Sequence, residues 1–148
     1  MELYDIISRT LHRWGQRHTE QLKRNLDATG KKDTGQLRAS IQFSVDGTIL
    51  QIEMEEYAKF IHEGRSPGKF PPVDEIRGWV ERKGLTIQGS SAPLDTQQRQ
   101  LAYLVGRKIA VHGIEPSPFI EDLPTDEIEE DLAGVITEWA TQQILGQS

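Results

Sequence analysis

The sequence predicts an α+β fold, in which a small antiparallel β-sheet is packed by helices, with a long helix at each terminus. Stretches near both ends show helical spacing of apolar residues, and a stretch between them alternates apolar and polar residues around an Asp-Gly pair. The chain has 148 residues, the size of one domain with a real core. We therefore predict a single domain over residues 1–148.

The first helix is predicted over about residues 2–28, where apolar side chains recur every three or four positions. Gly30 follows it and suits the left-handed cap that often ends a helix. The segment "SIQFSVDGTILQIEM" then alternates on both sides of Asp46-Gly47, the residue pair expected in a tight turn. A β-hairpin is therefore expected directly after the first helix.

Further helices are predicted from the spacing of apolar residues and from stop signals. A short one carries Tyr57 and Phe60 on one face and ends at Gly64. Three prolines make residues 66–72 an extended or turn-rich loop, because proline fixes φ and removes an amide donor. Longer helices are expected over about residues 73–83, 96–111 and 125–145.

The composition is typical of a soluble globular protein, with 36% hydrophobic and 27% charged residues. No stretch approaches the roughly 18 apolar residues of a membrane span, and the N-terminus lacks a signal-peptide pattern. We therefore expect the protein to work where it is made, in a cytoplasm. The chain has no cysteine, which excludes disulfides, thiolate metal sites and a cysteine nucleophile.

The charge is distributed unevenly around a net value of −6. Residues 1–40 carry a net charge of +3, and residues 41–114 hold nine acids and nine bases. Residues 115–148 hold nine acids and no base. This asymmetry favours an acidic end that meets a basic partner or repels something negative. A solvated acidic helix face explains the same run equally well.

The segment "EYAKFIHEGRSPGKFPP", residues 56–72, places His62 and Glu63 where an acid-base or metal site could lie. It lacks the second histidine of an H-E-x-x-H zinc helix, and the chain has no phosphate loop, nucleophile elbow or dinucleotide fingerprint. We therefore expect a joint that holds a binding loop, with no catalytic residue, metal or cofactor. An alternative remains in a metal-dependent hydrolase site formed by Glu55, Glu56, His62 and His112.

A DNA-binding module is the second alternative. Arginines at near-helical spacing on the first helix could face phosphates: Arg9, Arg13, Arg17 and Arg24. The acidic total and the lack of a helix-turn-helix or RNA-binding signature favour a solvated basic face, or one paired with an acidic surface.

Three motifs occur in order along the chain: "DTGQLRASI" before the hairpin, "YAKFIHEG" after it, and "PSPFIEDL" near the last helix. This order resembles the neck and tail-component proteins of long-tailed bacteriophages, which join head to tail. Their motifs are T-G-x-L-x-x-S-I, Y-A-x-[FYI]-[IV]-[EH]-x-G, and a P-F-[IL] that opens the last helix. The matching residues are Thr34, Gly35, Leu37, Ser40, Ile41, Tyr57, Ala58, Phe60, Ile61, Glu63, Gly64, Pro118, Phe119 and Ile120.

The resemblance covers about residues 33–123, and it has one departure: the extended "RSPGKFPPVDEIRGWVERKGL" stands where shorter members have a brief G-T-x loop. We expect Thr34 to cap the turn that follows it, and Leu37 and Ile41 to point inward and anchor the hairpin base. Tyr57 and Phe60 are expected to pack beneath the sheet.

The resemblance implies a structural virion protein, without enzymatic activity, that is made and assembled in the host bacterial cytoplasm. It implies a closed homo-oligomeric ring that contacts portal, adaptor or tail proteins and lies near duplex DNA, with no membrane and no cofactor. The partner surface is assigned to Arg65, Lys69, Phe70, Pro118 and Phe119. The DNA channel or a neighbour's basic helix is assigned to Glu127, Glu129, Glu130 and Asp131.

Overall fold

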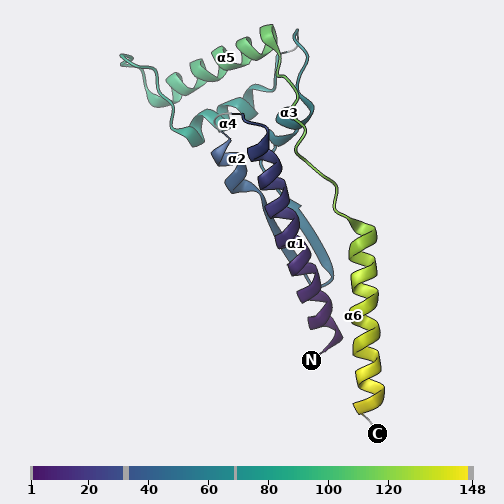
Figure 1. The fold of residues 1–148 in the computed structure, drawn as a ribbon. Coiled ribbons are helices and arrows are strands. Elements are labelled where there is room, and N and C mark those ends of the chain that lie inside the picture. Colours follow the sequence, from purple (N-terminus) through teal and green to yellow (C-terminus); the bar gives the residue numbers. More distant parts are fainter. Residues whose placement is uncertain (1, 32–33, 69, 147–148) are drawn as a thin grey trace. The chain divides into compact units, whose positions relative to one another are not determined.

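A computed structural model describes residues 2–31, 34–68 and 70–146 (Figure 1). These residues form six helices and one two-stranded antiparallel sheet, which confirms the α+β class and the long helix near each end. The bounds are α1 (Leu3–Ala28), α2 (Gly35–Ser40), β1 (Gln42–Asp46), β2 (Ile49–Glu53), α3 (Ala58–Glu63), α4 (Val73–Lys83), α5 (Leu94–His112) and α6 (Thr125–Gly146).

By its internal contacts, the chain divides into two compact units. Unit 1 comprises Met1–Glu55 and Phe119–Ser148, with α1, α2, the hairpin and α6. Unit 2 is the continuous segment Glu56–Pro118, with α3, α4 and α5. The single domain over residues 1–148 stays a prediction.

Unit 1 is built on the apolar stripe of α1, which buries Leu11 and Leu22. Gly15 lets the hairpin approach this helix closely, because a Cβ there would lie 2.5 Å from the Phe43 ring. The strand register makes Asp46 the last paired residue, opposite Ile49. The turn therefore lies one residue later than predicted, at residues 47–48.

Helix α6 runs antiparallel to α1 within unit 1 (Figure 1). The indole Nε1 of Trp14 donates a 2.8 Å hydrogen bond to Asp131, which ties the middle of α1 to the first half of α6. The Asn25 amide donates to the Phe119 carbonyl at 3.1 Å, near the other end of α1. These two contacts hold the segment before α6, and α6 itself, along the N-terminal helix.

Unit 2 is centred on α4 and α5, which pack side by side (Figure 1). Its buried apolar cluster consists of Ile76, Val80 and Ala102. The bounds of α4 agree with the prediction, while α5 begins at Leu94, two residues before the predicted start at Thr96. The structured core of unit 2 is thus a helix pair whose adjoining face carries the pocket described next.

Candidate interaction surface

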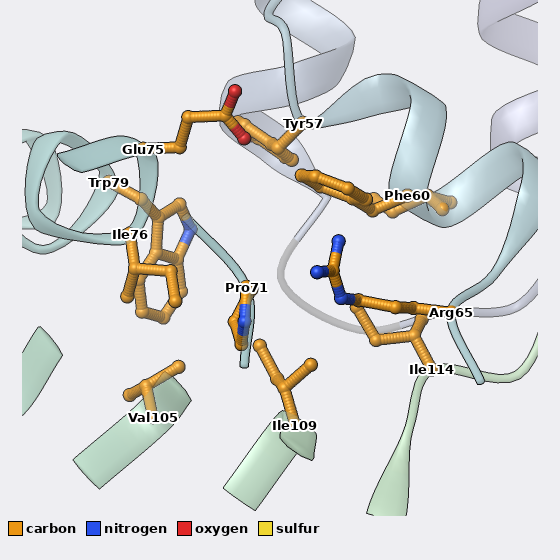
Figure 2. Close-up of a pocket in the computed structure, with 11 residues that line it drawn as sticks. Tyr57, Phe60, Arg65, Pro71, Glu75, Ile76, Trp79, Val105, Ile109 and Ile114 are labelled. Atoms are coloured by element: carbon orange, nitrogen blue, oxygen red, sulfur yellow. The ribbon is translucent and has the colours of Figure 1, made fainter. Parts of the chain in front are cut away.

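Unit 2 contains an apolar pocket with a volume of about 160 Å³ (Figure 2). Helix α4 contributes one wall, α5 a second, and α3 with its flanking residues a third. The lining residues are Tyr57, Phe60, Ile61, Arg65, Pro71, Glu75, Ile76, Trp79, Val105, Ile109 and Ile114.

Two glycines allow the backbone to close the α3 side of this pocket. Gly64 ends α3 with φ +73°, and a Cβ there would lie 2.6 Å from the Ile114 carbonyl oxygen. Gly113 ends α5 with φ +72°, where a side chain would be strained and would meet the backbone at Arg65. The backbones of Arg65 and Ile114 then exchange two hydrogen bonds of 2.8 Å, which fixes Arg65 in the wall.

Arg65 is the cation of the pocket. Its Nη2 donates to the Phe70 carbonyl at 3.2 Å, and its guanidinium carbon lies 5.2 Å from the centre of the Phe60 ring. Arg65 Nε is buried and has no hydrogen-bond partner among the described residues; the same holds for Oε2 of Glu75 on α4. The pocket is therefore apolar with two incompletely bonded charged groups, a pattern typical of ligand and partner sites.

An exposed aromatic pair lies on the surface formed by the proline loop and α5. Phe70 is 40% exposed and Tyr103 is 56% exposed, and their ring centres are 5.7 Å apart. The Phe70 ring lies over Gly106, where a Cβ would come within 2.6 Å of it. Glycine at this position thus makes room for Phe70 on α5, and the pair gives the loop an aromatic anchor of the kind enriched at interfaces.

The predicted partner surface is brought together only in part. Arg65 and Phe70 are adjacent in unit 2, as the hydrogen bond between them shows. Pro118 is exposed, and Lys69 lies outside the described residues. Phe119 was expected at a partner surface, but it is only 2% exposed, because it packs into the protein's own core. Its side chain therefore offers no free surface in this chain.

The first of the three motifs forms the base of the hairpin. Leu37 and Ile41 are 0% and 2% exposed, as the prediction of inward side chains requires. Thr34 occupies the N-cap position of α2, but its side chain makes no capping bond, contrary to expectation. Ser40 instead makes the key contacts: its hydroxyl donates to the Leu37 carbonyl at 2.6 Å and accepts from the Glu55 amide at 3.0 Å.

The second motif lies in unit 2. Ala58 is buried, Glu63 is exposed at the end of α3, and Gly64 ends the helix as predicted. Tyr57 and Phe60 were expected beneath the sheet, but they line the pocket with residues of α4 and α5. Helix α4 supplies the apolar partners that were expected from the sheet.

The third motif precedes the last helix and does not open it. Residues 118–120 have no helical structure, and α6 begins only at Thr125. The reason is visible in the contacts: the Phe119 carbonyl and the Glu121 carboxylate both accept bonds from Asn25. The motif therefore fastens the extended segment to α1.

The four predicted acidic residues of α6 separate into two groups. Glu127, Glu129 and Glu130 are exposed, and two of them line a shallow groove with Glu138. Asp131 is half-buried and bonded to Trp14, so its carboxylate serves within unit 1. Asp131 also lines the groove with Glu127 and Glu130, and its assignment to a channel wall or a neighbour stays a prediction.

The metal site of the hydrolase alternative is not formed in the described structure. No group of three His, Cys, Asp or Glu side chains that could hold a metal ion occurs among the described residues, so the suggested Glu55, Glu56, His62 and His112 set is not assembled there.

The arginines of the DNA-binding alternative lie on α1. Arg9 and Arg13 are exposed and flank an apolar groove of unit 1 with Ile6 and Val135. Arg17 lies over the Trp14 ring at 4.9 Å, and Arg24 bonds to Gln21 at 2.9 Å. In the part of the chain that the structure describes, no helix is both long and apolar enough to cross a membrane.

Most of the pocket residues were not predicted as site residues from the sequence. Its helical walls carry a signal that could have indicated it: Glu75 and Trp79, and likewise Val105 and Ile109, are four residues apart and share a helix face. Spacing alone marks such faces as core, however, and does not reveal that the space between them is unfilled.

The chain was compared with protein families, curated proteins and solved structures. No family model, curated protein or solved structure matches the chain. The resemblance to phage neck proteins therefore depends on the three motifs and their order.

Proposed function

We propose that this protein is a structural subunit of the head-tail connector of a long-tailed bacteriophage or prophage, a neck or tail-completion ring component between portal and tail. The observation that carries the proposal is the unit 2 surface, where a pocket and an exposed aromatic pair stand next to each other. Such a surface suits a protein partner, and the motifs suggest which assembly supplies it. The protein would be made in the host cytoplasm and retained in the virion.

A closed ring needs two different complementary surfaces on each subunit. The charges of the two units support this requirement: unit 1 has eight bases and sixteen acids, and unit 2 has nine bases and seven acids. Their net charges are therefore −8 and +2. Opposite signs favour contact between unit 1 of one copy and unit 2 of the next.

Either of two roles in a ring fits the exposed glutamates of α6. Glu127, Glu129 and Glu130 would line the channel and keep duplex DNA from adhering, or they would face the basic α1 of a neighbour. A structure of the assembled ring separates these roles. Placement of the three side chains on an outer rim, far from DNA and from a neighbour's Arg9 and Arg13, would rule out both.

The proposal is tested by particle images and size measurements of the purified protein, with and without the neighbouring virion proteins. Phe70→Ala is expected to reduce assembly while the monomer stays folded, because an exposed aromatic side chain contributes more to binding than to folding. Val111→Ala is the matched control, since Val111 is 61% exposed on α5 and does not line the pocket. Normal assembly of the Phe70 variant would make the proline loop a spacer.

A DNA-binding module is the second candidate, favoured by the exposed Arg9 and Arg13 beside the unit 1 groove. Such a module would bind duplex tightly at low salt, with affinity that falls steeply as salt rises. The connector subunit alone is expected to bind duplex weakly or not at all. Titration of labelled duplex with the purified protein at two salt concentrations distinguishes the two functions.

A further inference from the structure

The pocket of unit 2 has the size and lining for one apolar side chain. Its volume of about 160 Å³ is close to that of cavities, about 150 Å³, that hold a benzene ring. Ile76, Trp79, Val105 and Ile109 supply its apolar walls. An aliphatic or aromatic side chain of a partner would therefore fill it, without displacing any of the unit's own core.

The end of α6 offers suitable side chains on the same polypeptide. Ile144 is 72% exposed and Leu145 is 67% exposed, the two highest exposures among the large apolar residues of the described chain. Both lie in the last turn, where a helix carries the negative end of its dipole. No basic residue occupies that turn, so α6 has no cation of its own there.

The pocket supplies the missing charge. Arg65 holds a guanidinium in the pocket wall, with Nε buried and not bonded within the described residues. A cation at this position complements the negative carboxyl end of a helix. The net charges of −8 on unit 1 and +2 on unit 2 act in the same direction over a longer range.

We propose that the last turn of α6 of one copy docks in the unit 2 pocket of a second copy, with Ile144 or Leu145 filling the cavity and Arg65 facing the helix end. The inference rests on the proposed ring, for which it names the contact between neighbours. Because the two surfaces differ, the contact is head-to-tail, and it closes into a ring or continues as a filament according to the rotation between copies.

Glu75 provides a test of whether the group that docks in the pocket is negatively charged. Its carboxylate, on the α4 wall, is an unfavourable neighbour for the negative end of a helix. Glu75→Gln removes this negative charge and is therefore expected to strengthen self-association by about 2- to 5-fold. The size and shape of the side chain are retained, so the packing in the pocket is unchanged. Weaker association after this change would indicate a cationic partner and overturn the proposal.

The main experiment charges the end of α6 in the full-length protein. The double variant Ile144→Asp/Leu145→Asp is expected to self-associate about 10- to 100-fold more weakly, because the apolar anchor is lost. The control Gln142→Asp/Gln143→Asp adds the same charge to exposed positions of the same helix and is expected to have a much smaller effect. Sedimentation velocity over a concentration series measures both, and circular dichroism checks the helix content.

Cross-linking locates the contact, and the absence of native cysteine makes it specific. Leu145→Cys/Val105→Cys treated with a short bis-maleimide is expected to give a ladder of covalent oligomers. Leu145→Cys/Val111→Cys is the control, because Val111 lies on α5 without lining the pocket. An intramolecular product would overturn docking between copies, and equal ladders from both variants would overturn the pocket as its place.

The outcomes also separate this inference from the proposed function. If wild type and the Ile144/Leu145 variant form rings equally well, the pocket contact is wrong and the connector proposal stands. If wild type remains monomeric even with its virion neighbours, the connector proposal fails together with the contact.

Discussion

The two units of this protein differ in where their unpartnered buried polar groups lie. In unit 1, Thr10 and Thr19 donate to main-chain carbonyls within α1, and His18 lies 2.9 Å from the Glu121 carbonyl. Gln36 Oε1 of unit 1 is buried without a partner in the described structure, whereas in unit 2 two such atoms, Arg65 Nε and Glu75 Oε2, belong to residues that line one pocket. Unit 2 thus gathers unused bonding capacity at one pocket, where it is available to a partner.

The apolar cores show the same difference. Unit 1 buries long side chains such as Leu22 and Leu26, at 1% and 0% exposure. The fully buried members of unit 2 are small, Val80 and Ala102, while most of its larger side chains around the pocket, such as Trp79 and Ile109, are only half-buried. Large side chains that line a hollow contribute less to folding and remain available for association.

The largest expected effect is on unit 1. Leu22→Ala is expected to lower the free energy of unfolding by about 2–5 kcal/mol, because it leaves a cavity in a tightly packed helix face. Urea denaturation followed by circular dichroism measures the change. Val105→Ala, at a half-buried pocket position, is expected to cost less. A larger loss at Val105 would reverse the comparison between the units.

A smaller effect is expected from the glycine that closes the pocket. Gly64→Ala forces a side chain into φ +73° and toward the Ile114 carbonyl, so it is expected to cost about 1–3 kcal/mol. Hydrogen exchange should show weaker protection of α4 and α5 and unchanged protection of α1.

The matched control is Gly134→Ala in α6, where the added methyl would meet nothing within 4 Å apart from its chain neighbours and the helix's own backbone. Because alanine favours a helix interior over glycine, this variant is expected to gain about 0.5–1 kcal/mol. A loss of protection across α1 in the Gly64 variant would contradict the separate stability of the two units.

The smallest effect is expected at His62 and Glu63. General acid-base catalysis needs a partner within hydrogen-bond reach and a site that excludes water, and Glu63 is exposed at the end of α3. His62→Ala with Glu63→Gln should leave particle formation and DNA delivery within a few-fold of wild type. Loss of infectivity in normally assembled, DNA-filled particles would point to chemistry or gating instead.

Much of the fold follows from local signals in the sequence. Periodicity and glycine stops located α1 and α4, and Asp46-Gly47 located the hairpin to within one residue. These succeed because helix faces and tight turns are decided by residues close together in the chain. The division into two units was not found, because it depends on contacts between segments far apart.

The candidate site was predicted only around Arg65 and Phe70. The proline loop indicated an exposed segment, but Tyr57 and Phe60 were assigned to the wrong apolar partners, since apolar character does not say which surface a side chain meets. Phe119 and Asp131 could not be placed from the sequence for the same reason. Phe119 is a core residue and Asp131 accepts a hydrogen bond from Trp14, and both depend on contacts with residues about a hundred positions away in the chain.

The discontinuity of unit 1 has a consequence for synthesis on the ribosome. Unit 2 is continuous, so all of its contacts are available once Pro118 has emerged. The partners of Trp14 and Asn25 come later, at Asp131 and Phe119, and α1 must wait for them with part of its surface uncovered. The segment translated in the middle is therefore expected to reach its native form before the helix translated first.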